Sequence, residues 1–266
     1  MISLQIRNEL SRVPVTGTVP AIVSLTSYGK RVAQVHLTIE SIARGAVKPS
    51  RLILWLDDPE IYANLPKSLR RLQRRGLEVL LSENFGPHTK YLPYVLSDTT
   101  HELPLVTADD DTMYPVWWLE RLYASWSRDP QNVYCYRARV VTFTPEGDLA
   151  TYLDWPEVSS TVPRLRHFAL GVSGAIYPPH MLAELRRRGA TYDPALRHVD
   201  DIWLHSIAVS LQIRVAQAEP SPHDFPLLLS SQDVGLRHRN LDGGNNDKAA
   251  VVAYPPELLD RLRYEG

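Results

Sequence analysis

Apolar positions in the first half of the chain follow two alternating patterns. The segments 32–43, 66–75 and 116–127 have the spacing of helices. Short runs of β-forming apolar residues predict four buried strands, at residues 20–26, 51–56, 77–81 and 105–108. Strands that alternate with helices pair in parallel. This half therefore predicts an α/β fold with a mainly parallel, twisted central sheet and a ligand crevice at the carboxyl ends of its strands.

The second half is expected to be mixed. Residues 132–144 predict a strand that turns at 145–148 into another strand at 149–152, as in a β-hairpin. Residues 167–177 predict a further strand, interrupted by two glycines, which indicate either the close approach of a ligand or a bulge without function. Helices are expected at 178–188 and from 198 to 211, and we expect the chain to form one folding unit.

Charge and cysteine content narrow the class of protein. The chain of 266 residues has 29 basic and 30 acidic side chains, so its net charge gives no support for a nucleic-acid partner. A single cysteine, Cys135, excludes an internal disulfide framework and a cysteine-ligated zinc site, and it favours a reducing compartment.

The first 13 residues lack the apolar core of a signal peptide, and no run of about 18 apolar residues predicts a membrane span. We therefore expect a cytoplasmic protein. An alternative is peripheral attachment at the inner face of the membrane, because Ile2, Leu4, Ile6 and Leu10 could form a weak surface anchor. The competing interpretation is a helix that packs on its own domain.

Three adjacent acids, Asp109, Asp110 and Asp111, directly follow the predicted strand 105–108. Adjacent carboxylates repel one another, and a divalent cation with hard oxygen ligands, such as Mg²⁺ or Mn²⁺, relieves that repulsion and can itself be neutralised by a diphosphate. The alternative is an acidic turn that caps the next helix, for which one acid would suffice. The run therefore favours a metal site.

A second acidic pair, Asp200 and Asp201, stands before the apolar residues of a predicted helix. A carboxylate at a helix start, partly desolvated, is what a general base needs, although either residue could be only an N-cap. Lys90 follows the third predicted strand and could reach a phosphate, or be an ordinary surface lysine. Residues 235–248, with His238 and Arg239, are expected to form a mobile lid or binding loop, with disorder as the alternative.

Four features in this order carry a resemblance to a known family: residues 23–28 on the first strand, Asp57 after the second, Asp109 to Asp111 as an Asp-x-Asp motif, and residues 200–204 as an acid-Asp-x-x-Leu motif. Over residues 21–211 the chain resembles the GT-A class of nucleotide-sugar-dependent glycosyltransferases, in particular bacterial, family 2-like enzymes that build cell-surface polysaccharides. The resemblance implies a GT-A, Rossmann-like fold in one domain, 1–266. Residues from about 20 to 115 would bind the nucleotide sugar, and those from about 116 to 266 would bind the acceptor and include a C-terminal loop.

The resemblance implies roles for the matching residues on the side of the nucleotide sugar. Thr26 and Tyr28, with Arg31 nearby, would line the pocket for the base and ribose. Asp57 would meet the base, and Lys90 would meet the base or the diphosphate.

Further roles follow from the same resemblance. Asp109 or Asp110 would contact the ribose, and Asp111 would coordinate the cation that bridges the diphosphate; the metal-ligand set that we predict is Asp111, Asp109 and, as a later ligand, His238. The segment from Gly171 to Gly174 would allow close approach of the donor sugar or the acceptor, and we include Gly174 in the sugar-nucleotide site. Asp201 would be the catalytic base, and Asp200 would position it.

The predicted activity is that of a metal-dependent, hexosyltransferase-type enzyme of bacterial glycan biosynthesis. It would use Mn²⁺ or Mg²⁺ to move a sugar from a nucleoside diphosphate, with a UDP-sugar favoured, to a hydroxyl of a glycan or lipid-linked glycan. The absence of another nucleophile motif favours inversion, and retention stays an alternative. A non-catalytic sugar-binding or protein-binding module and a metal-dependent phosphohydrolase are competing hypotheses. Sugar nucleotidyltransferases share the architecture, but their glycine-rich arginine loop is missing from residues 24–31.

Overall fold

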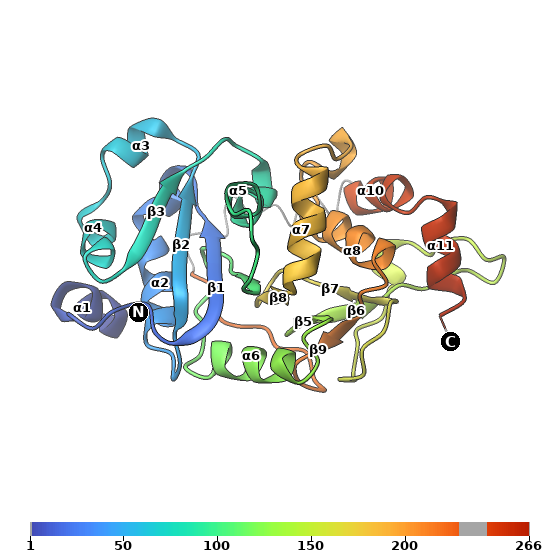
Figure 1. Ribbon diagram of the computed structural model, residues 1–266, viewed down its shortest axis with the longest axis horizontal. Helices are drawn as coiled ribbons and strands as arrows, with labels where there is room; N and C mark the ends of the chain where they lie inside the picture. Colours follow the sequence, from blue (N-terminus) through green and yellow to red (C-terminus); the bar gives the residue numbers. More distant parts are fainter. Residues whose placement is uncertain (1, 229–243, 266) are drawn as a thin grey trace.

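The computed structural model describes residues 2–228 and 244–265. Its centre is a seven-stranded sheet in the order β3-β2-β1-β4-β8-β5-β9, and a second sheet pairs β6 with β7 (Figure 1). The strands are β1 Val19–Thr26, β2 Pro49–Leu56, β3 Leu77–Leu81, β4 Leu105–Thr107, β5 Val133–Cys135, β6 Ala138–Val140, β7 His167–Ala169, β8 Ala175–Tyr177 and β9 Val215–Gln217.

The large sheet is parallel except at one strand. β1 pairs in parallel with β2 and β4, and β2 with β3. β8 is antiparallel to both of its neighbours, β4 and β5, and β5 pairs in parallel with β9. The predicted α/β class with a mainly parallel sheet is confirmed, as are the four strands expected in the first half.

Helices lie along the sheet and beyond it (Figure 1). The α-helices are α1 Ile2–Leu10, α2 Val35–Ala43, α3 Pro59–Ala63, α4 Lys67–Gln73, α5 Leu92–Ser97, α6 Trp118–Arg128, α7 Pro179–Arg188, α8 Asp200–Ser210, α10 Asn245–Ala253 and α11 Pro256–Arg263. Short 3₁₀ helices are η1 Gly29–Ala33, η2 Gly86–Lys90, η3 Tyr152–Asp154 and η4 Pro194–Leu196.

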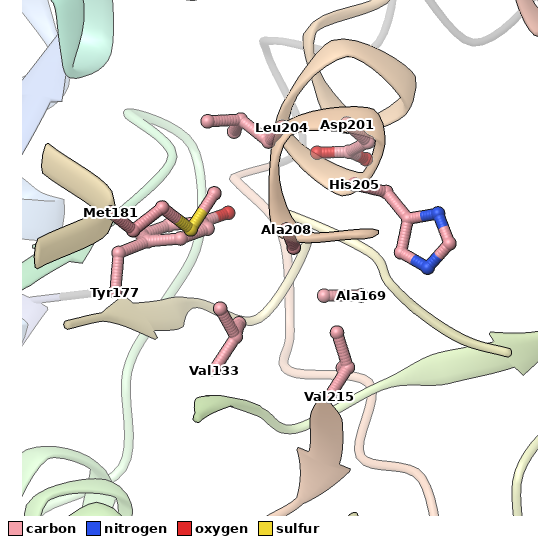
Figure 2. A pocket seen from close by; sticks show the side chains of 9 residues that line it. All are labelled: Val133, Ala169, Tyr177, Met181, Asp201, Leu204, His205, Ala208 and Val215. Atoms are coloured by element: carbon pink, nitrogen blue, oxygen red, sulfur yellow. The ribbon is translucent and has the colours of Figure 1, made fainter. Parts of the chain in front are cut away.

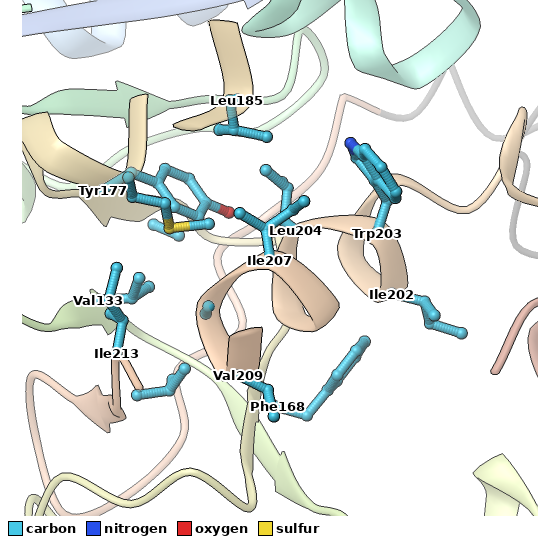
Figure 3. Close-up of a cluster of buried hydrophobic side chains, with 14 of the residues drawn as sticks. Val133, Phe168, Tyr177, Leu185, Ile202, Trp203, Leu204, Ile207, Val209 and Ile213 are labelled. Atoms are coloured by element: carbon cyan, nitrogen blue, oxygen red, sulfur yellow. The ribbon is translucent and has the colours of Figure 1, made fainter. Parts of the chain in front are cut away.

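Apolar side chains fill both faces of the sheet, which explains why the parallel strands read as continuous apolar runs. On one face, Ile22 of β1 and Leu105 of β4 share a cluster with residues of α5, α7 and α8. On the other, Val23 and Val106 from the same strands pack with α2, α4 and α6. Figure 3 shows α8 laying Leu204 and Ile207 toward Tyr177 and Val133 of the sheet. This packing fixes the start of α8 relative to the strand ends.

Two expectations for the second half are wrong in detail. Residues 167–177 form two strands in different sheets, because Ser173 at φ 71° and Gly174 at φ 99° turn the backbone between β7 and β8 out of the extended region. Residues 132–144 likewise divide into β5 and β6. The expected turn at 145–148 is present, but its hairpin is short: Phe143 and Leu149 form an isolated antiparallel bridge, and the N–H groups of Thr144 and Ala150 donate to the carbonyls of Asp148 and Thr142.

Both ends of the described chain are helical, at residues 2–10 and, in two helices, at 245–253 and 256–263. The N-terminal segment is helix α1, but only Leu4 of its four apolar residues packs inward. Residues 245–248 belong to helix α10, so the expected loop is wrong there, and residues 235–243 lie outside the described part. Among the described helices, none has the length and apolar character needed to cross a bilayer.

Candidate active site

The predicted site residues meet at one edge of the sheet. β1, β2 and β4 run in parallel, and in their register Thr26 lies opposite Trp55, while Ser24 lies opposite Thr107. Polar residues follow each strand end, among them Asp57 after β2 and the acidic run after β4. Because the carboxyl ends of parallel strands share an edge, these groups come together although they are far apart in sequence.

Lys90 joins the two acidic clusters of the chain. Its Nζ lies 2.9 Å from Asp200 Oδ2 and 3.5 Å from Asp109 Oδ1. The lysine side chain is only 10% exposed. Burial alone would lower the pKa of Lys90, but the charges of Asp200 and Asp109 outweigh that effect and hold this pKa well above its usual value. Lys90 is therefore a fixed cation between the acidic run after β4 and the start of α8.

The two aspartates of α8 have opposite protonation behaviour. Burial raises the pKa of Asp201 to about 7, and the neighbouring charge of Asp200 adds to the increase. Burial acts in the same direction on Asp200, but the charge of Lys90 outweighs it and lowers the pKa of Asp200 below its usual value. Such a difference between the pKa values of two adjacent carboxyl groups is expected when one stays ionised in an ion pair and the other exchanges protons near neutral pH.

One oxygen of Asp201 has no hydrogen-bond donor within the described part of the chain. The N–H of Gly171 donates a hydrogen bond to Oδ2 at 3.1 Å. Oδ1 is buried, and no group in the described residues donates a hydrogen bond to it. Figure 2 shows Asp201 among the mostly apolar side chains that line a small pocket. This pocket has a volume of about 10 Å³, room for roughly one water molecule. Tyr177, Met181 and Leu204 form part of this wall, which accounts for the desolvation of the carboxylate.

Gly171 is where the loop between β7 and β8 closes on the acidic pair. A Cβ atom at this position would lie 2.8 Å from Asp201 Oδ1 and 3.0 Å from Lys90 Nζ. Both distances are shorter than ordinary van der Waals contact, so only glycine fits here without displacing the charged groups.

The acidic run is held by side chains from the segment after β1. Ser27 Oγ donates to Asp110 Oδ2 at 2.6 Å, and Arg31 forms ion pairs with Asp110 and with Asp111 Oδ2, the latter at 2.6 Å. Thr38 Oγ1 donates to the carbonyl of Asp110 at 2.8 Å. Burial raises the pKa of Asp110 to about 6, although the charge of Arg31 opposes the increase.

Sequence reasoning assigned no role to three of the residues that shape this run. They are Ser27 and Thr38, described above, and Tyr114, whose hydroxyl accepts a hydrogen bond from the N–H of Asp109 at 2.9 Å. Ser27 stands inside residues 23–28, and Tyr114 is three residues after the acidic run, so their proximity in sequence to these motifs was the available signal. Thr38 had no signal, because it reaches the run from the middle of α2.

The chemistry of the run suits a divalent cation. Asp109 and Asp111 keep 29% and 20% of their side chains exposed, so their oxygens can be reached. Within residues 2–228 and 244–265 no three His, Cys, Asp or Glu side chains form a ready-made metal site. Mg²⁺ and Mn²⁺ are commonly bound by one or two carboxylates together with substrate phosphates and water, and this set of oxygens fits that arrangement.

The other predicted nucleotide-site residues lie at the same edge. Thr26 Oγ1 donates to the carbonyl of Trp55 at 3.1 Å, and Asp57 Oδ2 accepts from Asn84 Nδ2 at 2.5 Å. Tyr28 is 39% exposed, and the guanidinium carbon of Arg31 lies 5.6 Å from its ring centroid. Their roles in nucleotide binding stay predictions.

Two predicted residues stand apart from this cluster. Gly174 faces Trp118, where a Cβ would lie 2.8 Å from Cζ2, so packing explains this glycine without a ligand. His238 lies outside the described residues. A cavity of about 300 Å³ on another side of α8, lined by Arg188, Trp203 and Glu257 among others, includes none of the acidic cluster. The candidate site is therefore defined by its chemistry at the strand ends.

Comparisons with known proteins support the fold. No protein-family model matches this chain, and a search of curated proteins found no significant match. Among solved structures, residues 1–349 of S. aureus TarS give a TM-score of 0.51 at 13% identity, covering 77% of this chain and 59% of that one. The same TarS fragment in complex with UDP gives 0.50 at 11% identity with the same coverage. The present chain thus spans 59% of the length of the TarS fragment.

The second kind of neighbour covers nearly the whole chain. The inositol-1-phosphate CTP transferase from T. maritima gives a TM-score of 0.50 at 12% identity, covering 94% of this chain and 98% of that one. Identities this low establish the fold and not the reaction. The mixed sheet, its strand order and these similarities together show that the chain shares the α/β fold of TarS and of the CTP transferase.

Proposed function

We propose that this chain is a metal-dependent glycosyltransferase that moves a sugar from a nucleoside diphosphate to an acceptor hydroxyl with inversion. The observation that carries the proposal is the state of Asp201: a desolvated carboxyl with a pKa of about 7, one of whose oxygens is buried and has no hydrogen-bond donor among the described residues. It lies beside Lys90, which also contacts the acidic run after β4. This contact supports our placing the base beside the diphosphate site.

The sugar donor would bind at the run after β4. Asp111 and Asp109 would hold Mn²⁺ or Mg²⁺, which when bound stabilises the charge that develops on the diphosphate leaving group. Arg31 contacts Asp111 and Asp110. Its guanidinium can instead pair with a diphosphate oxygen that enters the site. Lys90 adds a second cation at the boundary between the sugar donor and the acceptor.

The acceptor would be activated by Asp201. With a pKa of about 7, a substantial fraction of this carboxylate is ionised at neutral pH, and it remains basic enough to take the proton of a hydroxyl as that oxygen attacks. The ion pair of Asp200 with Lys90 keeps a negative charge next to Asp201 and so maintains its basicity. A base of this kind typically contributes about 10²–10⁴-fold in rate.

A UDP-sugar and a glycan or lipid-linked glycan of bacterial surface polysaccharide are the substrates that we propose. Support for the nucleotide comes from the structural similarity to TarS, which has been solved in complex with UDP. Because the chain is also similar to a CTP transferase, nucleotidyl transfer is the alternative reaction, and glycosyl transfer and nucleotidyl transfer differ in their products. Glycosyl transfer releases a nucleoside diphosphate, whereas nucleotidyl transfer releases pyrophosphate.

The test is a thermal-shift screen of UDP-, GDP-, CMP- and dTDP-sugars with Mn²⁺ or Mg²⁺, followed by product analysis. A ligand at a hundred times its dissociation constant should add about 2.7 kcal/mol to the free energy of unfolding. We expect one nucleotide class to stabilise the protein only with the cation, and nucleoside diphosphate to be released with an acceptor. NMR of the product should show the anomeric configuration inverted. Stabilisation by none of these sugars, or release of pyrophosphate in a parallel assay with CTP and a sugar 1-phosphate, would contradict the proposal.

A further inference from the structure

Helix α1 is packed with its apolar stripe outward. Its buried residues are Leu4 and Asn8, at 2% and 1% exposure. Ile2, Ile6 and Leu10 are 79%, 49% and 73% exposed. These three recur every four residues, so they follow one another along a single side of the helix. A buried asparagine with a row of exposed large aliphatics reverses the usual arrangement and indicates that this side has a partner.

The polar contacts of α1 prevent it from turning its stripe inward. Asn8 Nδ2 donates to Glu40 Oε1 and to the carbonyl of Ser68, both at 3.2 Å. Arg71 of α4 donates to Asn8 Oδ1 at 2.9 Å, and Arg7 pairs with Glu40 at 3.1 Å. A rotation of the helix would take Asn8 and Arg7 away from these partners, and a buried polar group that loses its partner is strongly unfavourable. The outward stripe is therefore a fixed feature of the fold.

Helix α4, the neighbour of α1 in Figure 1, carries a stripe of basic side chains. Lys67, Arg70 and Arg74 are exposed, and their spacing of three and four residues places them on one side of α4. Arg70 also donates to the carbonyl of Leu65 at 2.9 Å, which orients it without removing its charge. Arg12, also exposed, follows the end of α1. The near-zero net charge of the whole chain hides this local excess of positive charge.

We propose that α1 and α4 form a docking face for an anionic lipid bilayer. Ile2, Ile6 and Leu10 enter the interface between headgroups and acyl chains, while Lys67 and Arg74 contact the anionic headgroups. An apolar stripe or a basic cluster alone gives marginal membrane binding, and their combination supplies the two signals that stable peripheral binding needs. Charge complementarity selects a lipid surface over an apolar protein partner. The inference does not depend on the proposed reaction.

The test is sedimentation of the full chain with vesicles of phosphatidylcholine alone and of phosphatidylcholine with about 30 mol% phosphatidylserine. We expect binding only to the vesicles that contain phosphatidylserine, and we expect it to weaken as salt is raised. Substitution of Lys67, Arg70 and Arg74 by glutamine should lower the partition coefficient roughly a hundredfold, because each cation near such a surface contributes about one factor of five. The pair Ile6→Ser and Leu10→Ser should lower it at least about tenfold.

The matched control is Val251→Ser on α10, which removes a side chain that is 76% exposed but lies away from this face. It should leave vesicle binding unchanged. All these positions are exposed, so circular dichroism and melting should match those of the wild type. Wild-type protein that stays in the supernatant with both vesicles overturns the proposal. So does a dimer in sedimentation velocity that Leu10→Ser dissociates, because the face would then belong to a second copy of the chain.

Discussion

Replacement of Asp201 by asparagine should abolish turnover and, at alkaline pH, make the protein more stable. The amide has the shape of the carboxylate, and its oxygen can still accept the hydrogen bond from the N–H of Gly171. It cannot take a proton from an acceptor, so the rate should fall by about 10²-fold or more while affinity for the sugar donor changes little. If Asp201 served only the structure, the Asp201→Asn variant would lose stability and keep its turnover.

The size of the stability effect follows from the pKa of Asp201. This pKa is raised from 3.8 to about 7, so the folded protein holds a proton that the unfolded chain releases. The free energy of unfolding therefore falls as pH rises from about 4 to 7, by about 1.36 kcal/mol per pH unit. Asparagine has no proton to lose. Its stabilising effect should increase between pH 5 and pH 8 by up to about 2.7 kcal/mol, which is roughly 5 °C in Tm for a chain of this size.

The assay is urea and thermal unfolding of both proteins at pH 5 and pH 8, together with product release at pH 8. Asp193→Asn is the matched control, because Asp193 caps η4 by accepting from the N–H of Ala195 at 2.8 Å. Asparagine replaces aspartate well in a cap, so turnover and stability should stay close to those of the wild type. The reasoning is refuted if Asp201→Asn retains turnover, or if it changes stability equally at both pH values.

Three other substitutions test two neighbours of Asp201 and one partner of the acidic run. Gly171→Ala should destabilise the fold by about 1–3 kcal/mol in urea and lower turnover, since its Cβ would press on Asp201 and Lys90; wild-type values of both would contradict the close approach. Lys90→Met leaves Asp200 buried and unpaired, which should cost about 3–5 kcal/mol, more at pH 8 than at pH 5; an equal loss at both pH values would argue against the pair. Arg31→Gln frees Asp111 from its ion pair, so the affinity for Mn²⁺ without nucleotide, measured by calorimetry, should rise roughly fivefold or more. Unchanged affinity would indicate that the cation binds elsewhere.

The strands and the acidic run were predictable because the pattern that marks them is local. β1 and β2 are buried on both faces, so nearly every residue in them is apolar, and a cluster of aspartates directly after such a run is visible in the sequence. The break between β7 and β8 was not predictable. It depends partly on Ser173 at φ 71°, a conformation that is uncommon for serine and that tertiary packing imposes.

The candidate site was predicted as a set of residues but not as a set of contacts. Lys90 was expected to reach phosphate, whereas the fold also pairs it with Asp200, a residue far away in the chain. Likewise, Arg31 was expected near the base and ribose, and it contacts two acids of the run. Periodicity reports which face a residue occupies within one element, and it carries no information about which ends of separate elements meet.

The antiparallel strand β8 has a consequence for how the protein can move. Ile176 pairs with Val106 of β4 on one side and with Tyr134 of β5 on the other, so one hydrogen-bonded ladder runs from the strands of the first half to those of the second. A hinge motion between the two halves would have to break these backbone hydrogen bonds in the middle of the sheet. Substrates would then be admitted by exposed loops at the strand ends, which can open without disturbing the ladder. Hydrogen exchange should show this division as slow amides in β4, β5 and β8 beside fast amides in exposed loops.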